Sequence, residues 1–175
     1  MKILDGDRYT LEGMPTQKTI AVIRSGGQIG VDRGAIDAAI KMNIPFVGWV
    51  PKGGKAYDYI DPPGLLKDYP TLIETPHDDY FERTAWNVRD AHATLIIFPE
   101  DKELTSGTKY TYDVAKFLNR PVFITKGKDV QKIIDWINTI GKAIVLNIAG
   151  PRESKMPDVY QKAYKIMLEL LKKDI

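Results

Sequence analysis

The 175-residue sequence contains no cysteine and only two histidines. The lack of cysteine excludes disulfide bonds, thiolate metal sites and cysteine nucleophiles. The histidines do not show the paired spacing of zinc ligands, so we expect no metal bound by protein side chains. No Ser–His–Asp arrangement is suggested either. The polar residues are therefore more typical of a binding site than of a reactive centre.

A strong charge of one sign and a long apolar run are also missing. The net charge is only +2, and no run of like charges marks a nucleic-acid-binding tail. No apolar run approaches the roughly 18 residues of a membrane span. The polar stretch 1–18 lacks the apolar core of a signal peptide. We therefore expect a cytoplasmic protein that has neither a membrane nor nucleic acid as its partner.

Short apolar stretches alternate with helical patterns after residue 18. The apolar stretches predict strands at 19–24, 45–50, 93–99, 120–125 and 143–148. Alternating strands and helices favour parallel pairing through right-handed crossovers. The sequence therefore predicts a three-layer α/β/α fold with a mostly parallel sheet of about five strands. Residues 19–175 are expected to form this single domain. Residues 1–18 are expected to be an N-terminal appendage, either a short hairpin or an arm that packs on a neighbour.

A glycine-rich turn follows the first predicted core strand. It contains Ser25, Gly26, Gly27, Gln28, Gly30 and Asp32, and a helix begins within it. Backbone N–H groups in such a turn, together with the positive end of the helix dipole, can bind a phosphate. The spacing matches neither the Gly-x-Gly-x-x-Gly fingerprint nor the P-loop, so an NAD domain and a P-loop NTPase are both unsupported. Asp32 can cap the helix, or it can accept a hydrogen bond from a ribose or a pterin amine.

The loops that follow the other predicted strands should lie along the same edge of the sheet. Trp49 could stack on a flat ring and Lys52 could pair with a phosphate, or the two could be a core tryptophan and a solvated lysine. The segment Thr105–Thr108 could hold a second phosphate at a helix start, or it could only cap that helix. Arg152 could reach over the same edge, or it could form an ion pair within its loop.

One predicted helix carries polar residues at a helical spacing. Arg83, Asn87 and Asp90 fall at positions i, i+4 and i+7, opposite an apolar stripe that includes Phe81 and Val88. Such a polar face is usually solvated. The combination of a guanidinium group and an amide on one face is nevertheless suited to a binding site, so both interpretations stay open here.

Several of these motifs resemble one known family. The segments 25–33, 48–53, 83–90 and 147–155 resemble, in the same order, the motifs of the "putative molybdenum carrier" (molybdenum cofactor carrier-like) family. The resemblance covers about residues 19–171 and implies a Rossmann-like domain of the LOG/DprA-type group. Ile29 stands where we expect threonine, and Thr105–Thr108 follows the expected small-residue turn only loosely. The acidic signature of the LOG phosphoribohydrolases is missing, which argues against glycosidic cleavage.

The resemblance implies a carrier for the molybdenum cofactor, a pterin with a phosphate and a metal-bearing dithiolene. This ligand brings its own sulfur atoms, which is compatible with a chain that has no cysteine. We therefore predict a binding protein for a phosphorylated heterocycle rather than an enzyme. The alternative is a nucleotide-processing enzyme that cleaves an N-glycosidic or phosphate bond. The family analogy also implies a homo-oligomer, a dimer or a tetramer, with Tyr110, Tyr112 and Phe117 extending onto a neighbour.

The expected ligand-binding residues are gathered from all of these segments. They are Ser25, Gly26, Gly27, Gln28, Gly30, Asp32, Trp49, Lys52, Arg83, Asn87, Ser106, Gly107, Thr108 and Arg152.

Overall fold

The computed structural model describes residues 2–4, 8–10, 18–104 and 106–174. In the described part of the N-terminal stretch, β1 (Lys2–Leu4) pairs with β2 (Arg8–Thr10) in an antiparallel hairpin. Residues 1, 5–7 and 11–17 of the predicted appendage, including Leu11, lie outside the described residues. The division of the chain into an appendage and one domain stays a prediction.

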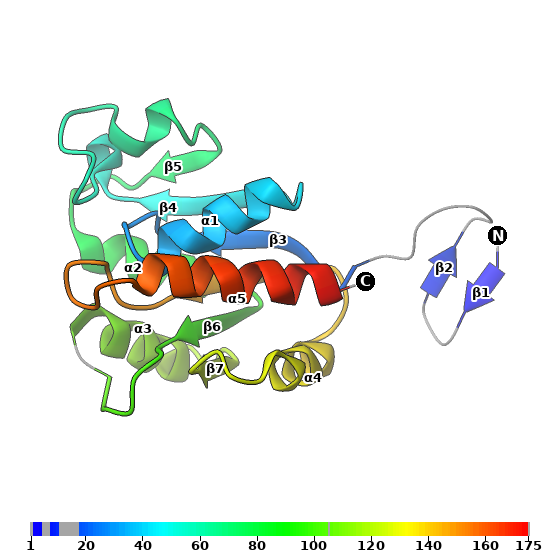
Figure 1. Ribbon diagram of the computed structural model, residues 1–175. Helices are drawn as coiled ribbons and strands as arrows, with labels where there is room; N and C mark the ends of the chain where they lie inside the picture. The colour runs from blue at the N-terminus through cyan, green and yellow to red at the C-terminus, as the bar shows by residue number, and fades with distance from the viewer. Residues whose placement is uncertain (1, 5–7, 11–17, 105, 175) are drawn as a thin grey trace.

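A parallel sheet forms the centre of the molecule (Figure 1). Its strands are β3 (Ile20–Ser25), β4 (Phe46–Val50), β5 (Leu72–Glu74), β6 (Ala93–Ile97), β7 (Val122–Thr125) and β8 (Ile144–Ala149). Their order across the sheet is β5-β4-β3-β8-β6-β7, and every neighbouring pair is parallel. The last strand of the chain, β8, therefore lies between β3 and β6 in the middle of the sheet.

The sheet has six strands, whereas the sequence predicted about five. The additional strand is β5, which has only three residues, two of them exposed. It lies inside the segment 51–76, which is rich in proline and glycine and also contains the short 3-10 turns Lys52–Gly54 and Gly64–Lys67. A strand of three residues, two of them exposed, does not contain the long apolar run from which a strand can be predicted.

Helices cover both faces of the sheet, as the Rossmann-like α/β prediction requires. The helices α1 (Val31–Lys41), α4 (Val130–Ile140) and α5 (Val159–Lys173) lie on one face, while α2 (Tyr80–Arg89) and α3 (Ser106–Phe117) lie on the other (Figure 1). For α1 to α4 this division follows from right-handed crossovers, because α1 and α4 connect strands in one direction along the sheet and α2 and α3 in the other. The last helix, α5, follows β8 and packs beside α1. The resulting fold is a three-layer α/β/α sandwich.

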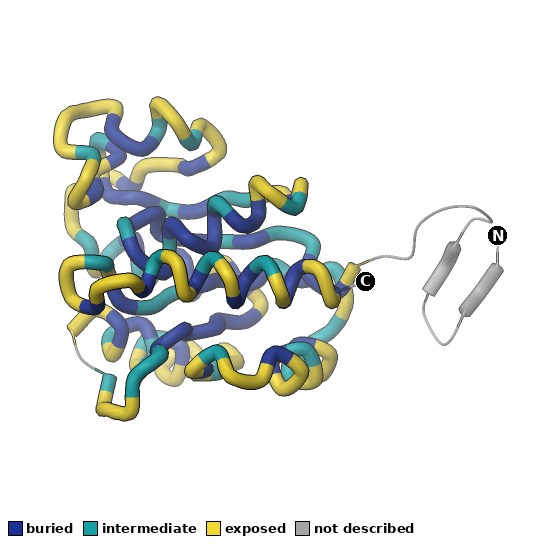
Figure 2. The backbone as a smooth tube through the Cα atoms, in the orientation of Figure 1, coloured by how far each residue is buried: buried dark blue, intermediate teal, exposed yellow. Residues whose placement is uncertain are grey.

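The sheet is buried between these two layers (Figure 2). All five residues of β6 are buried, as is typical of a parallel strand covered on both faces. The largest apolar cluster joins the sheet to α1, α4 and α5 through residues such as Ile23, Leu95, Leu146 and Met167. A smaller cluster of Ile36, Val50, Ala56, Leu65 and Leu72 anchors the segment 51–76 to α1 and β4. Together the two clusters fix the positions of the strands, and thereby the points at which the loops begin.

Candidate functional site

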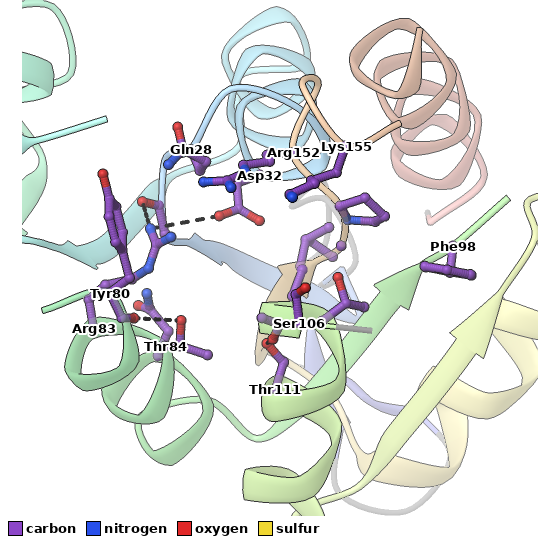
Figure 3. A pocket seen from close by; sticks show the side chains of 18 of the residues that line it. Gln28, Asp32, Tyr80, Arg83, Thr84, Phe98, Ser106, Thr111, Arg152 and Lys155 are labelled. Atoms are coloured by element: carbon purple, nitrogen blue, oxygen red, sulfur yellow. Dashed lines mark hydrogen bonds and ion pairs between the residues drawn. The ribbon is translucent and has the colours of Figure 1, made fainter. Parts of the chain in front are cut away.

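A cavity of about 520 Å³ opens beyond the carboxyl ends of the central strands. Its walls come from the turn after β3, the first turns of α2 and α3, and the loops after β6 and β8 (Figure 3). This is the edge where open α/β sheets bind ligands. Of the residues predicted to bind a ligand, those in the cavity wall are Gly26, Gln28, Asp32, Arg83, Asn87, Ser106, Gly107, Thr108 and Arg152.

The glycine-rich turn is held in shape by its own polar groups. The Ser25 hydroxyl donates to the Asp32 carbonyl at 2.9 Å and accepts from the Gly27 N–H at 3.2 Å. Gly27 has a positive φ and faces the apolar residues Leu65 and Val50. Ser25 and Gly27 therefore stabilise the turn through contacts with the rest of the fold, and they do not line the cavity.

Gly30 joins this turn to the loop after β8. It forms an antiparallel bridge with Arg152, and the neighbouring Val31 N–H donates to the Pro151 carbonyl at 3.1 Å. Gly30 has a φ of 135°, and a side chain here would strike the Pro151 carbonyl and the Arg152 backbone. Glycine is thus required for conformation and for close approach of the two loops. This contact brings Arg152 to the cavity although it lies far from Gly30 in the sequence.

Arg83 and Asp32 form the polar floor of the cavity. Arg83 is 8% exposed, and its Nη1 donates to the Gly26 carbonyl and lies 3.9 Å from Asp32 Oδ2. Burial raises the pKa of Asp32 to about 6, although the positive charge of Arg83 and the backbone of Gln28 act in the opposite direction. Burial lowers the pKa of Arg83, and the charge of Asp32 partly offsets that effect. Each charge therefore makes the burial of the other less costly.

The structure decides between the two interpretations of the polar face of α2. The face with Arg83 and Asn87 is buried, whereas Phe81, assigned to the apolar stripe, is 56% exposed. Asn87 reaches the β4 backbone, accepting from the Trp49 N–H at 2.8 Å and donating to the Trp49 carbonyl at 2.9 Å. These hydrogen bonds compensate for burying the amide. The usual assumption that the polar face of a helix is solvated therefore fails for α2.

Trp49 lies near the end of β4, and Lys52 follows the strand. Neither residue lines the cavity. The Trp49 Nε1 donates to Asp90 at 2.7 Å, and its ring meets the Trp86 ring edge-on, with centroids 5.0 Å apart. Lys52 lies in a 3-10 turn, where its backbone N–H donates to the His77 carbonyl. The contacts of both residues therefore stabilise β4 and the loop that follows it, on the side of β3 away from β8.

The opposite wall of the cavity is basic. Lys102 comes from the loop after β6, while Arg152 and Lys155 come from the loop after β8. These cations line the same cavity as the start of α3, where a side chain added to Gly107 would meet no other described residue within 4 Å. Thr105 lies outside the described residues. Among the described residues that line the cavity as a whole, Asp32 is the one acidic residue, so the cavity is predominantly positive.

Several wall residues were not predicted from the sequence. They are Tyr80, Phe81, Thr84, Phe98, Lys102, Thr111, Asn147, Ile148, Ala149, Gly150, Pro151, Lys155 and Met156. A usable signal existed for Lys155, because it belongs to the same loop motif as Arg152. No local pattern distinguishes Tyr80 or Asn147 from ordinary helix and strand residues. They reach the cavity because of how α2 and β8 pack.

A family model described as the circularly permutated YpsA SLOG family matches residues 23–171. The chain belongs to this family. In this member of the YpsA SLOG family, the matched region contains the whole parallel sheet except the first residues of β3. The family resemblance predicted from the motifs is confirmed.

A solved structure is similar to this SLOG-family chain over most of its length. It is the crystal structure of a protein from Syntrophus aciditrophicus SB named "putative molybdenum carrier protein". The two chains share 37% sequence identity and align with a TM-score of 0.78, covering 89% of this chain and 96% of the other. Among curated proteins, none matches this chain.

Across residues 2–4, 8–10, 18–104 and 106–174, no group of three or more histidine, cysteine or acidic residues could hold a metal ion. None of the helices described here has the length and apolar character needed to cross a membrane.

Proposed function

We propose that this protein binds a phosphorylated heterocyclic compound in the cavity and carries it, with the molybdenum cofactor as the leading candidate cargo. The observation that carries the proposal is that Lys102, Arg152 and Lys155 line the same cavity as the start of α3. Backbone N–H groups at a helix start and basic side chains around them are the two features that bind phosphate. Ser106 and Thr108 add hydroxyl groups at the same place.

The remaining cavity suits the ring system of such a ligand. Tyr80, Phe81 and Phe98 contribute aromatic surface to its walls, and Phe81 is held edge-on against Tyr110 with ring centroids 4.7 Å apart. Aromatic side chains with a few polar groups are typical of sites that bind flat organic ligands. A volume of about 520 Å³ falls within the ordinary range for small-molecule pockets.

The molybdenum cofactor is preferred because of the similar crystal structure and the chemistry of the chain. The Syntrophus protein is named a putative molybdenum carrier. The dithiolene of the cofactor supplies sulfur to the metal, so a carrier does not need cysteine ligands, and this chain has none. Gln28, Asn147 and Thr84 in the wall offer hydrogen bonds to the pterin. A nucleotide-processing enzyme, the alternative, is not favoured by these comparisons.

Binding is tested by calorimetric titration with molybdenum cofactor under anaerobic conditions, and with nucleoside monophosphates and inorganic phosphate. We expect saturable binding of the phosphorylated heterocycles, and inorganic phosphate should compete. Replacing both cations of the loop after β8 (Arg152→Gln with Lys155→Gln) should weaken binding at least about tenfold, since charge-assisted hydrogen bonds are lost.

The matched control removes the same charge from the loop after β4. A protein with Lys52→Gln and Lys55→Gln should bind as the wild type does, because Lys52 and Lys55 lie outside the cavity wall. No binding of any compound at micromolar protein concentration would contradict the proposal. An equal loss of affinity in both double variants would also contradict it, by showing that only the net charge matters.

A further inference from the structure

Asp32 is unusual among the residues of the cavity wall. It lies in the first turn of α1, and its side chain is 12% exposed and directed into the cavity (Figure 3). The charged residues that share the wall with it are the cations Arg83, Lys102, Arg152 and Lys155. A carboxylate here repels the phosphate that those cations attract. The protein therefore places a group that weakens binding of a simple anion inside its own anion site.

Within the fold, Asp32 has few contacts that would explain its presence, the main one being a hydrogen bond from the backbone of Gln28. The N-cap of α1 is Gly30, and no side chain caps this helix. Arg83 Nη1 lies 3.9 Å from Asp32 Oδ2, beyond hydrogen-bond distance, and donates to the Gly26 carbonyl instead. Within the described chain, no side chain donates a hydrogen bond to the Asp32 carboxylate. A carboxylate has about four acceptor sites, so beside the hydrogen bond from the Gln28 backbone both oxygens remain able to accept hydrogen bonds from a ligand.

The neighbouring Arg83 restricts what that ligand group can be. A positively charged amine next to Asp32 would lie close to the buried guanidinium of Arg83 and be repelled by it. A neutral group with hydrogen-bond donors does not meet this repulsion. Because a carboxylate has two acceptor oxygens in one plane, its best neutral partner presents two parallel N–H groups.

Resting on the proposed function, we infer that Asp32 determines ligand specificity by accepting two hydrogen bonds from a donor–donor edge of the heterocycle. The 2-amino-4-oxo edge of a pterin has this arrangement, with a ring N–H beside an exocyclic amine. Guanine has the same edge. Adenine presents one donor beside an acceptor, and hypoxanthine presents a single donor. The cavity thus selects 2-amino-4-oxo heterocycles and discriminates against adenine-type rings.

The expected discrimination is large because Asp32 is mostly buried. A ligand without the donor pair leaves a buried carboxylate facing an acceptor, and sites built around such hydrogen bonds reject unmatched analogues strongly. The ring nitrogen of adenine adds direct repulsion between lone pairs. We expect adenosine 5′-monophosphate to bind at least about tenfold more weakly than guanosine 5′-monophosphate. Inosine 5′-monophosphate, with one donor, should fall between them.

The test compares these three nucleotides, which share ribose and phosphate and differ only in the edge of the base. Dissociation constants are measured by calorimetry at pH 8, where Asp32 and the phosphate are both ionised. A phosphorylated 2-amino-4-oxopteridine forms a second arm, which distinguishes a pterin cargo from a guanine nucleotide by relative affinity. Inorganic phosphate, included as a competitor, reports the phosphate subsite alone.

Asp32→Asn is the decisive variant. It should reduce the preference for guanosine over adenosine monophosphate to less than about threefold, because an amide offers one acceptor and one donor. Asp113→Asn makes the same chemical change on α3, where Asp113 is 52% exposed and pairs with Lys109, and should keep the wild-type ranking. Thermal unfolding of both variants verifies that they are folded.

The outcomes separate this inference from the proposed function. Equal binding of the three nucleotides, with phosphate competing, would overturn the role of Asp32 and leave the phosphate subsite intact. An unchanged preference in Asp32→Asn would overturn it as well. Failure of every compound, inorganic phosphate included, would instead refute the proposed function itself.

Discussion

Arg83 Nη1 lies 3.9 Å from Asp32 Oδ2 and also donates to the carbonyl of Gly26, so one guanidinium joins α2 to the turn that begins α1. Both side chains are mostly buried, at 9% and 12% exposure. A guanidinium in this position serves the fold and the cavity at once. It compensates for the carboxylate that faces the ligand, and it secures the turn that forms the cavity floor.

Replacing Arg83 with methionine should destabilise the protein by about 2–4 kcal/mol, because a buried carboxylate and a buried carbonyl both lose their partner. The free energy of unfolding is measured by urea denaturation at pH 7.5. The double variant Arg83→Met with Asp32→Asn should regain at least about 1 kcal/mol of this loss, since no uncompensated charge remains. Additive effects of the two substitutions would show that the pair does not interact.

The stability of the fold should depend on the protonation of Asp32. Its pKa is about 6 in the folded protein, against 3.8 ordinarily, so the folded state binds more protons than the unfolded state between these values. Stability from this group is therefore fully present below about pH 4 and is lost as the pH rises through 6. The loss amounts to about 1–3 kcal/mol.

Asp32→Asn removes this dependence and provides the measurement. The difference in unfolding free energy between variant and wild type should shift in favour of the variant between pH 4 and pH 7. Urea denaturation at several pH values gives the difference, and comparing the two proteins cancels the other titrating groups. A difference that stays constant across this range would mean that Asp32 titrates at its ordinary pKa.

Two glycines at or next to the cavity should differ strongly in their tolerance of substitution. Gly30→Ala forces alanine into a φ of 135° and against the Pro151 carbonyl, so we expect a loss of at least about 2 kcal/mol. Gly107→Ala is the control, because nothing lies within 4 Å of the added carbon. It should change stability by no more than about 1 kcal/mol. Comparable losses in the two variants, measured by thermal unfolding, would refute the assigned contact.

Self-association is expected from the family analogy and stays a prediction. Exposed apolar residues indicate which surface would be covered. Phe117 is 88% exposed at the end of α3, and Ile124 on the edge strand β7 is 42% exposed. Exposed apolar groups of this size are often covered in an assembly. Light scattering should give the mass of a dimer or a tetramer, and Phe117→Ser should lower it. A monomer at all concentrations would rule the prediction out.

Much of the fold could be predicted because strong local patterns coincide with its elements. The apolar run 93–99, predicted as a strand, contains β6. β5 could not be predicted, because three residues with two exposed carry too weak a pattern. The sequence left open whether the polar face of α2 is solvated or part of a site, since only its partner on β4 explains why Asn87 is buried.

By itself, the sequence determined the alternation of strands and helices, the glycine turn and the basic loops, because these depend on local composition and periodicity. Only the tertiary structure decided which loops meet. The cavity forms beyond β3, β8 and β6, which are neighbours in the sheet, so the loop with Arg152 and Lys155 faces it. The loop with Lys52 follows β4, on the other side of β3, and lies outside. Strand order, which depends on long-range pairing, thus separates two lysine-bearing loops that look alike in the sequence.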